Sequence, residues 1–325
     1  MIDIKLLEQL CLCNGISGDE GNVRNLIINE IKDCADDIKT DNLGNLIVFK
    51  KGKKSAKSKL MVSAHMDEVG LMVTDITSDG YLKFDEVGGI DRRVLPGKRV
   101  CVGRNGLNGV IGVKPIHLTN GDEKTAVPKM NDMYIDIGAE SREDALKYVN
   151  YGDGINFEGD FKINGKTVVT KALDDRFGCY VLINLIKSEP EYDMYFTFVV
   201  QEEVGLRGAR PAAFTVNPDF ALVIESTTAA DVAEVDASHQ VCNLSKGATV
   251  TVMDRATVYD KEMISAAFEL AEKNNIAVQY KRAVAGGNDS GAIHQSRGGV
   301  RTLAVSLPSR YIHAPSTAAN LDDCE

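Results

Sequence analysis

Acidic residues and histidines follow apolar segments of this sequence at several points. They occur in five short segments: His65-Met66-Asp67, Asp174-Asp175, Glu202-Glu203, Glu225 and His313. Imidazoles and carboxylates together form a nitrogen and oxygen ligand set that suits zinc, cobalt or manganese. A carboxylate has two oxygens and can bridge two ions, and two ions can share and activate a water. The residue types therefore indicate a metal site assembled from distant parts of the chain.

The pair Glu202-Glu203 is the strongest of these signals. It follows the apolar run Tyr195–Val200, which is typical of a strand covered on both faces. Two adjacent carboxylates at the end of such a strand repel each other unless cations compensate. Consecutive strand residues point to opposite faces, so both acids can serve one site only if the chain leaves strand geometry, which Gly205 allows. We expect the site at this edge of a sheet.

The other segments each have a plainer interpretation when taken alone. His65 and Asp67 project to the same face of an extended chain, as a ligand and its orienting carboxylate would, or as a hydrogen-bonded pair would. Asp174-Asp175 precedes a predicted helix and suits an N-cap. Glu225 can be the first solvated residue of a strand, and His313 a solvated loop residue. The five segments together favour a metal site more than any one does.

The elements that must position these residues have the α/β texture. Helical spacing predicts helices over 4–12 and from Ser17 to about Asp33, the second opened by a capping box of Ser17 and Glu20. Strands and helices alternate after about residue 166, which implies a sheet with helices on both faces. We predict strands over 46–49, 60–64, 168–170, 194–200, 220–224, 249–253, 277–280 and 302–307, and helices over 175–187 and 261–273.

A β-rich insert interrupts this alternation. Between Gly80 and Gly165 lie 14 of the 29 glycines, and only Ser141–Tyr148 has a helical pattern. Strand segments over 99–102, 109–113, 133–137 and 155–158 suit a small barrel or sandwich. We therefore divide the chain into a first part of an α/β domain over 1–69, an insert over 70–165 and a second α/β part over 166–325.

Composition argues against several classes of partner. The 325 residues carry a net charge of −10, which disfavours nucleic acid and anionic membranes as partners. The lysine-rich stretch Lys50–Lys59 has no interleaved aromatic residues and suits a solvated loop between two strands. Seven cysteines without CxxC spacing indicate a reducing compartment. With no run of 18 apolar residues, the sequence predicts a cytoplasmic protein.

Four segments resemble the signature segments of the M42 metalloaminopeptidases. These are Ala64–Gly70, Lys171–Arg176, Val200–Ala209 and Arg310–Pro315. They occur in the family's order, and the match covers essentially the whole chain. The resemblance implies a zinc-peptidase-like mixed sheet sandwiched by helices, with an inserted PDZ-like small β-barrel that makes dimer contacts. It also implies peptide substrates and a homo-oligomer, which in many such proteins is a tetrahedral dodecamer.

The resemblance also implies roles for single residues. Two divalent metal ions per subunit, zinc or cobalt and less commonly manganese, would be held by His65, Asp174, Glu203, Glu225 and His313. Asp174 would bridge the ions and Glu202 would be the general base, with Asp67 supporting catalysis by orienting His65. Gly286–Gly291 resembles a loop near the substrate pocket, which makes Gly287 and Asp289 candidate substrate-binding residues. A glycine-rich N-cap is the alternative for that loop.

Two departures from the family pattern bear on these expectations. Glu225 stands where the family usually has aspartate, and its extra methylene can change how the carboxylate binds a metal. Relatives usually continue past the position of Glu325 through a terminal helix, so we expect either that the sequence is trimmed here or that the lack of that helix weakens assembly.

Two rival functions stay open at this point. A glycoside hydrolase needs two carboxyl groups about 5–10 Å apart across a cleft usually lined by aromatic rings, and this sequence has no tryptophan. A non-catalytic peptide-binding or assembly protein with a degenerate metal site is the second. HExxH, GxSxG and P-loop motifs are absent, which disfavours single-zinc proteases, serine hydrolases and nucleotidases.

Overall fold

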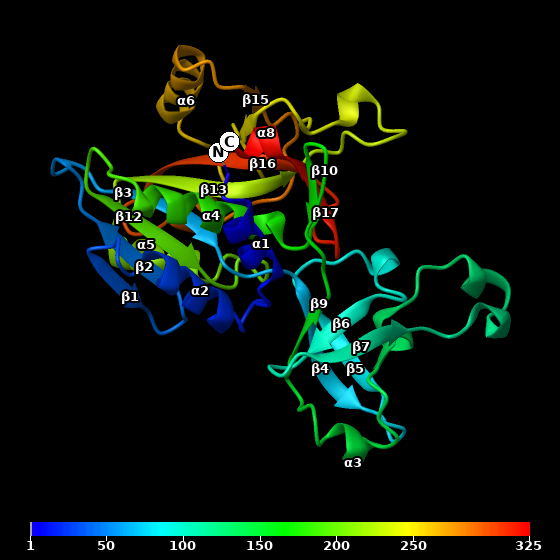
Figure 1. Ribbon diagram of the computed structural model, residues 1–325. Helices are drawn as coiled ribbons and strands as arrows, with labels where there is room; N and C mark the ends of the chain where they lie inside the picture. Colours follow the sequence, from blue (N-terminus) through cyan, green and yellow to red (C-terminus); the bar gives the residue numbers. More distant parts are fainter. Residues whose placement is uncertain (1) are drawn as a thin grey trace.

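A large mixed sheet organises the computed structural model, which describes residues 2–325 (Figure 1). Its strands, in spatial order, are β1 (Asp37–Thr40), β2 (Leu46–Lys50), β12 (Met194–Val199), β3 (Leu60–His65), β13 (Phe220–Thr228), β16 (Arg301–Arg310), β17 (Thr317–Asn320), β11 (Thr167–Thr170) and β10 (Lys162–Asn164). Strand β14 (Ala248–Val250) also pairs with β16, and β15 (Val278–Tyr280) pairs with β14. The central strands β12, β3, β13 and β16 run parallel, so their carboxyl ends meet at one edge.

Helices cover both faces of this sheet. One face packs on α1 (Ile4–Leu12), α2 (Gly21–Ile31) and α4 (Leu173–Lys187), and the other on α5 (Ala209–Val216), α6 (Lys261–Lys273) and α7 (Ser290–Ile293). Strand β12 shows how one strand serves both faces of the sheet. Its alternate residues Phe196 and Phe198 enter the first apolar core, while Tyr195 packs against the second. A short α8 (Leu321–Cys324) follows β17. The predicted sheet between two helical layers is confirmed.

The β-rich insert folds as a closed six-stranded barrel. Its strands, in spatial order, are β4 (Gly70–Ile76), β5 (Leu82–Val87), β8 (Tyr134–Asp136), β7 (Leu107–Gly112), β6 (Arg99–Val102) and β9 (Gly154–Phe157). The barrel has its own apolar core and projects from the α/β part (Figure 1). The predicted barrel is confirmed, although β10, which lies before residue 165, pairs with β11 in the large sheet. The chain division at 70 and 165 stays a prediction.

Several predicted elements are shorter than expected. The helix predicted over 141–148 is the four-residue α3 (Arg142–Ala145), with Ser141 as its N-cap. The remaining single turns are 3₁₀ helices over Arg92–Val94, Ile116–Leu118, Gly121–Lys124, Met130–Asp132 and Ala237–His239.

The predicted capping box of Ser17 and Glu20 is wrong. Helix α2 begins at Gly21, and Glu20 stands at the N-cap position without a side-chain cap bond. Ser17 Oγ instead donates to Asp67 Oδ2 at 2.6 Å. Glu20 Oε1 accepts from the Gly18 N–H at 2.7 Å and from the Gln201 N–H at 3.2 Å. Both side chains are used in contacts with other loops, which the local pattern does not show.

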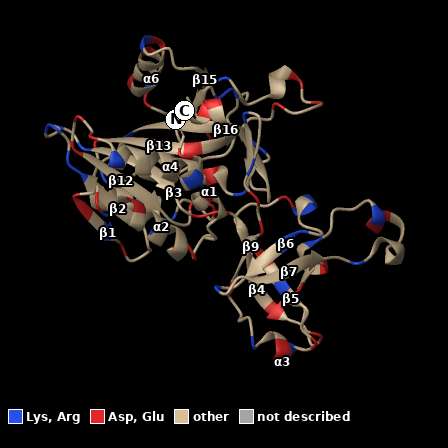
Figure 2. Cartoon of the chain, in the orientation of Figure 1, with Lys and Arg blue, Asp and Glu red and all other residues tan. Residues whose placement is uncertain are grey.

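Acidic and basic residues are interspersed along both parts of the chain (Figure 2). The lysine-rich stretch lies between β2 and β3 as predicted, and Lys54 pairs with Glu191 at 2.6 Å. In the described residues, none of the helices has the length and apolar character needed to cross a membrane.

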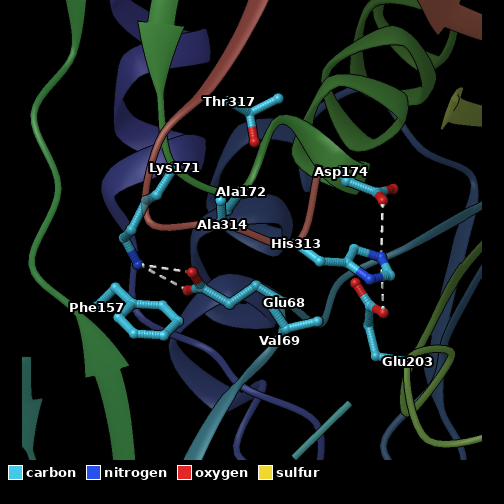
Figure 3. A pocket seen from close by; sticks show the side chains of 10 residues that line it. All are labelled: Glu68, Val69, Phe157, Lys171, Ala172, Asp174, Glu203, His313, Ala314 and Thr317. Atoms are coloured by element: carbon cyan, nitrogen blue, oxygen red, sulfur yellow. Dashed lines mark hydrogen bonds and ion pairs between the residues drawn. The ribbon is translucent and has the colours of Figure 1, made fainter. Parts of the chain in front are cut away.

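A buried ion cluster lies where the chain passes from the α/β part into the barrel. Glu68 accepts from Lys171 Nζ at 2.7 Å and from Arg176 Nη2 at 3.3 Å, and the three side chains are at most 4% exposed. The Gly15 N–H donates to Glu68 Oε1 and to Asn156 Oδ1 of β9. Figure 3 shows Lys171 directed at Glu68. This cluster ties the barrel to the loop after α1 and to the start of α4.

We expect Glu68→Gln to lower the unfolding free energy by about 3–5 kcal/mol, because the cations Lys171 and Arg176 would stay buried without a countercharge. The shift of the urea denaturation midpoint measures this. Glu123→Gln is the control, since Glu123 pairs with Lys114 at the surface, and we expect no resolved shift. Equal midpoints for both variants would contradict the assigned role of the cluster.

Candidate metal centre

All five predicted metal ligands lie together at the carboxyl edge of the central strands. His65 ends β3, Glu225 lies in β13, Asp174 begins α4, Glu203 follows β12 and His313 follows β16. Ligand atoms of His65, Asp174 and Glu225 lie within 4.8 Å of one another, and so do those of Asp174, Glu203 and His313. A third such group joins His65 and Glu203 to Glu202. Asp174 belongs to the first two groups, which is the position a bridging carboxylate would occupy.

The ring of His65 is held by the backbone and directed at two carboxylates. Its Nδ1 lies 2.9 Å from the carbonyl oxygen of Asp67, which can only accept a hydrogen bond. Its Nε2 lies 3.3 Å from Asp174 Oδ1 and 3.2 Å from Glu225 Oε1. Burial lowers the pKa of His65, but the Glu225 and Asp174 carboxylates raise it by more, so the pKa lies well above its usual value. The residue that orients His65 is Asp67, as expected, but mainly through its carbonyl, because its carboxylate lies 3.5 Å away.

The carboxylate of Asp67 holds the loop that carries the two glutamates. It accepts from the N–H groups of Glu202 at 3.0 Å and Glu203 at 3.1 Å, and from Ser17 Oγ. Although burial raises its pKa, the nearby His65 ring and the hydrogen bond from Ser17 hold the pKa of Asp67 below its usual value. The chain leaves strand geometry here, with φ of 56° at Gln201. The expected departure after Val200 is therefore present, and it places adjacent residues in one site.

His313 lies between the carboxylates of Asp174 and Glu203 (Figure 3). Its Nε2 is 3.4 Å from Asp174 Oδ2 and 3.2 Å from Glu203 Oε2. Burial lowers the pKa of His313 but these carboxylates raise it, to about 9. Burial and the nearby Asp174 raise the pKa of Glu203 to about 8. Burial also raises the pKa of Asp174, yet its hydrogen bonds to His313 and His65 bring it below the usual range. The cluster therefore holds protons where a cation would otherwise stand.

Glu202 is the remaining predicted catalytic carboxylate beside the ligand cluster. Ligand atoms of Glu202, His65 and Glu203 lie within 4.8 Å of one another. Glu202 is not part of either ligand group that contains Asp174. Burial raises the pKa of Glu202 well above its usual value, and Glu225 adds to the effect although His65 opposes it. A carboxylate whose pKa is raised beside a candidate metal site has the property that a general base needs.

The candidate ligand set fits a divalent cation. Glu225 Oε2 is buried and has no hydrogen-bond partner among residues 2–325. Burial raises the pKa of Glu225 to about 7 in spite of the nearby His65. Neutral imidazole nitrogens and carboxylate oxygens are zinc, cobalt and manganese ligands, and a cation would supply the missing partner. The donor types and their separation of at most 4.8 Å within each group therefore suit a metal ion.

A cavity of about 160 Å³ adjoins these residues. Its walls include Asp174 and Glu225, the predicted substrate-binding Gly287, and two residues that the sequence did not indicate, Lys281 and Ser306. Neither residue belongs to a recognisable motif. Both line the cavity because segments that are distant in sequence meet at this edge of the sheet.

The second predicted substrate-binding residue is Asp289, next in sequence to Asn288 of the cavity wall. It is fully buried at the N-cap of α7 and makes no side-chain cap bond. Both its carboxylate oxygens lack hydrogen-bond partners within residues 2–325, and burial raises its pKa well above the usual value. Asp289 is not among the described residues that line the cavity, whereas its neighbour Asn288 is.

Comparisons with known proteins find aminopeptidases that are similar to this chain over nearly its whole length. The model of the M42 glutamyl aminopeptidase family matches residues 44–325. A putative aminopeptidase of Acetivibrio thermocellus is 44% identical over 98% of this chain and 94% of its own length. A lysyl aminopeptidase of Pyrococcus furiosus is 33% identical over 100% of this chain and 94% of its own length.

Solved structures give the same result over nearly the full chain. A TET aminopeptidase from a marine sediment thaumarchaeon has a TM-score of 0.94 and 33% identity over 99% of this chain and 92% of that one. The TET1 peptidase of Pyrococcus horikoshii has a TM-score of 0.87 and 40% identity over 99% and 95%. A Thermotoga maritima structure described as an endoglucanase has a TM-score of 0.82 and 38% identity over 98% and 92%.

The family resemblance noted in four sequence segments is thus confirmed by an independent match over most of the chain. Homologues named as aminopeptidases make it a peptide hydrolase. The chain belongs to the M42 glutamyl aminopeptidase family.

Proposed function

We propose that this protein removes the N-terminal residue from peptides with two divalent metal ions and with Glu202 as general base. The observation that carries the proposal is the pair of ligand groups that share Asp174. His65 and Glu225 would complete one metal site, and Glu203 and His313 the other. Zinc or cobalt suits this mixed donor set, and manganese is a further candidate.

Two ions bound there would polarise the peptide carbonyl, lower the pKa of a water and help to bind the free α-amine. Glu202 takes the proton of the attacking water and passes it to the departing amine nitrogen. The Asp67 carboxylate keeps the Glu202 backbone in place for this transfer, because it accepts the Glu202 N–H at 3.0 Å. The Asp67 carbonyl keeps the Nε2 atom of His65 toward the ligand cluster.

The relative described as an endoglucanase supports glycoside hydrolysis as a second candidate. That chemistry needs one carboxyl acid and one carboxylate across a sugar-binding cleft, and it gives no task to two imidazoles among carboxylates. The ligand groups around Asp174 therefore favour the peptidase. A non-catalytic peptide-binding protein would lack both activities.

We expect hydrolysis of an aminoacyl-p-nitroanilide panel by the zinc-, cobalt- or manganese-loaded protein and no release of sugar from carboxymethylcellulose. Glu202→Gln should keep the metal content and lower turnover about 10²- to 10⁴-fold, as for a lost general base. Glu203→Gln is the matched variant and should lower the metal content itself. Full turnover by Glu202→Gln would refute its role, and sugar release without anilide hydrolysis would favour the rival.

Metal uptake should release protons. Near neutral pH and without metal, Glu203 with its pKa of about 8 and His313 with its pKa of about 9 are mainly protonated. Ligands must lose their protons to bind, so affinity should rise as the pH increases from about 6 to about 8. Zinc calorimetry at neutral pH in two buffers of different ionisation enthalpy counts the protons. An affinity independent of pH would contradict the proposed ligands.

We also propose a cytoplasmic homo-oligomer built from dimers through the barrel. The Pyrococcus TET1 relative is described as assembling into a tetrahedron or an octahedral shell. The connection between β7 and β8 of the barrel exposes Ile116 and Leu118, which are 72% and 56% accessible. Light scattering after gel filtration should give an even multiple of 35.3 kDa. Ile116→Asp with Leu118→Asp should lower that mass, and a wild-type monomer would refute the proposal.

A further inference from the structure

The barrel reaches the metal centre through two glycines that none of the roles above uses. Gly88 and Gly89 follow strand β5 and precede the 3₁₀ turn over Arg92–Val94. A β-carbon added at Gly88 would lie 3.2 Å from Cβ of Glu203, and one added at Gly89 would lie 3.8 Å from Nδ1 of His313. The backbone of this barrel segment is therefore packed against two of the five candidate metal ligands.

The core of the barrel adjoins the same ligand group. Val69 and Phe157, which belong to that core, line a small cavity together with Asp174, Glu203 and His313 (Figure 3). The cavity has a volume of about 10 Å³, which is about the space that one water molecule needs, so little room separates the barrel from these ligands. We call the ligand group of Asp174, Glu203 and His313 the His313 site.

The other ligand group, the His65 site, has a different support. It consists of His65, Asp174 and Glu225, and His65 and Glu225 lie in strands of the large sheet. The Nδ1 atom of His65 lies 2.9 Å from the carbonyl oxygen of Asp67. Neither His65 nor Glu225 lines the small cavity beside the barrel. The barrel therefore borders only one of the two candidate metal sites directly.

Glu203 has little freedom to move away from the barrel. Its N–H donates to Asp67 Oδ2 at 3.1 Å, which fixes its backbone. Gly88 has a φ of 87°, a left-handed conformation that favours glycine, and a β-carbon there would also lie 2.8 Å from Cγ1 of Val69. Val69 is buried in the barrel core, so a shift of its side chain would disturb close packing. Glycine at this position thus allows the barrel backbone to approach Glu203.

The ring of His313 needs a partner on the side that faces away from the carboxylates. A neutral imidazole that binds a cation through Nε2 carries its proton on Nδ1, and metal-binding histidines usually donate that proton to a carbonyl, a carboxylate or water. The acceptor for His65 is the Asp67 carbonyl, whereas Nδ1 of His313 lies beside Gly89. Burial lowers the pKa of His313, and the Gly89 backbone is among the groups that raise it, as an acceptor for the ring proton would.

The loop that carries His313 is itself held in an uncommon conformation. It joins β16 to β17, and Tyr311 and His313 have φ of 61° and 59°. Such values are uncommon for residues other than glycine and persist where surrounding contacts hold them. The segment of Gly88 and Gly89 provides one such contact, and it comes from the barrel rather than from the sheet.

We propose that the barrel segment of Gly88 and Gly89 positions Glu203 and His313, with the Gly89 carbonyl accepting the ring proton of His313, so that the His313 site depends on the barrel and the His65 site does not. The inference rests on the proposed two-metal function and gives the barrel a task in the reaction besides assembly. Gly88 and Gly89 are positioning residues, because they contact ligands and not the reacting atoms.

Zinc binding to the metal-free protein tests this dependence. Gly88→Ala would press its β-carbon on Glu203 and Val69, and we expect it to weaken one of the two zinc sites about 10- to 100-fold, as for a lost outer partner of a ligand, and to spare the other. Gly97→Ala is the matched control. Gly97 also lies in the barrel part, has a φ of 77°, and has no atom beyond its chain neighbours within 4 Å of an added β-carbon. Equal zinc binding by both variants overturns the inference.

A double variant identifies the affected site. Glu203→Gln removes a ligand of the His313 site and should cause a loss similar to that of Gly88→Ala. Because both changes act on one site, we expect Gly88→Ala to cause no further loss of zinc in the Glu203→Gln background. Weaker binding of the remaining ion in the double variant would place the effect at the His65 site and overturn the inference.

Crystal structures of the metal-free variants give a readout that needs neither zinc nor turnover. In Gly88→Ala, the 3.2 Å distance between His313 Nε2 and Glu203 Oε2 should increase beyond about 4 Å, the limit of an ion pair, whereas in Gly97→Ala it should stay the same. An unchanged arrangement in both variants overturns the inference. If the wild type binds no zinc, the two-metal function fails, while these structures still decide whether the barrel positions the two ligands.

Hydrogen exchange of the wild type covers the case in which Gly88→Ala does not fold. Zinc should slow amide exchange at residues 87–91 as well as at 311–315, because fixing the ligands restricts the segment that is packed against them. The turn of Gly97 should exchange at the same rate with and without zinc. Slower exchange at 311–315 without any change at 87–91 overturns the inference.

Discussion

Repulsion among buried carboxylates is the constraint on which the rest of this structure depends. Asp174, Glu203 and Glu225 lie at one sheet edge with their oxygens a few ångströms apart, and Glu202 stands beside them. Such a group is unfavourable in a low-dielectric interior unless protons or cations neutralise it. The raised pKa values of Glu203 and Glu225 record that cost. Parallel central strands, whose carboxyl ends coincide, hold the acids together, and two imidazoles supply the nitrogen ligands that a metal would use.

Four consecutive residues show how the surrounding structure accommodates that constraint. His65 presents its Nε2 to the cluster, and the Met66 carbonyl accepts from the Arg176 guanidinium at 2.8 Å. The Asp67 carboxylate accepts hydrogen bonds from the N–H groups of Glu202 and Glu203, so this buried anion holds the loop after β12 in place. Glu68 closes the ion cluster at the entrance to the barrel. Alternation along an extended chain sends these groups in different directions, which couples the metal centre, the loop after β12 and the barrel within one short segment.

Much of the fold and the place of the candidate ligands in it could be predicted from sequence because both depend on local signals. Apolar runs ending in acids locate the carboxyl edge, and the change in glycine density locates the barrel. The errors occur where a tertiary contact overrides a local pattern. Ser17 and Glu20 satisfy the capping-box spacing, yet their side chains bind Asp67 and the backbone of Gln201. Lys281, beside Arg282, has the pattern of a solvated basic pair, and only the return of β15 to the sheet places it in the cavity.

Metal content and proton content of this cluster are connected through charge. When ionised, Asp174, Glu202, Glu203 and Glu225 carry about four negative charges, which two divalent ions would balance. Without ions, protons take that place, because the pKa of Glu203 is raised to about 8 and that of His313 to about 9. Protons and ions are thus alternatives at the same atoms, and the binding of metal near neutral pH would have to displace protons.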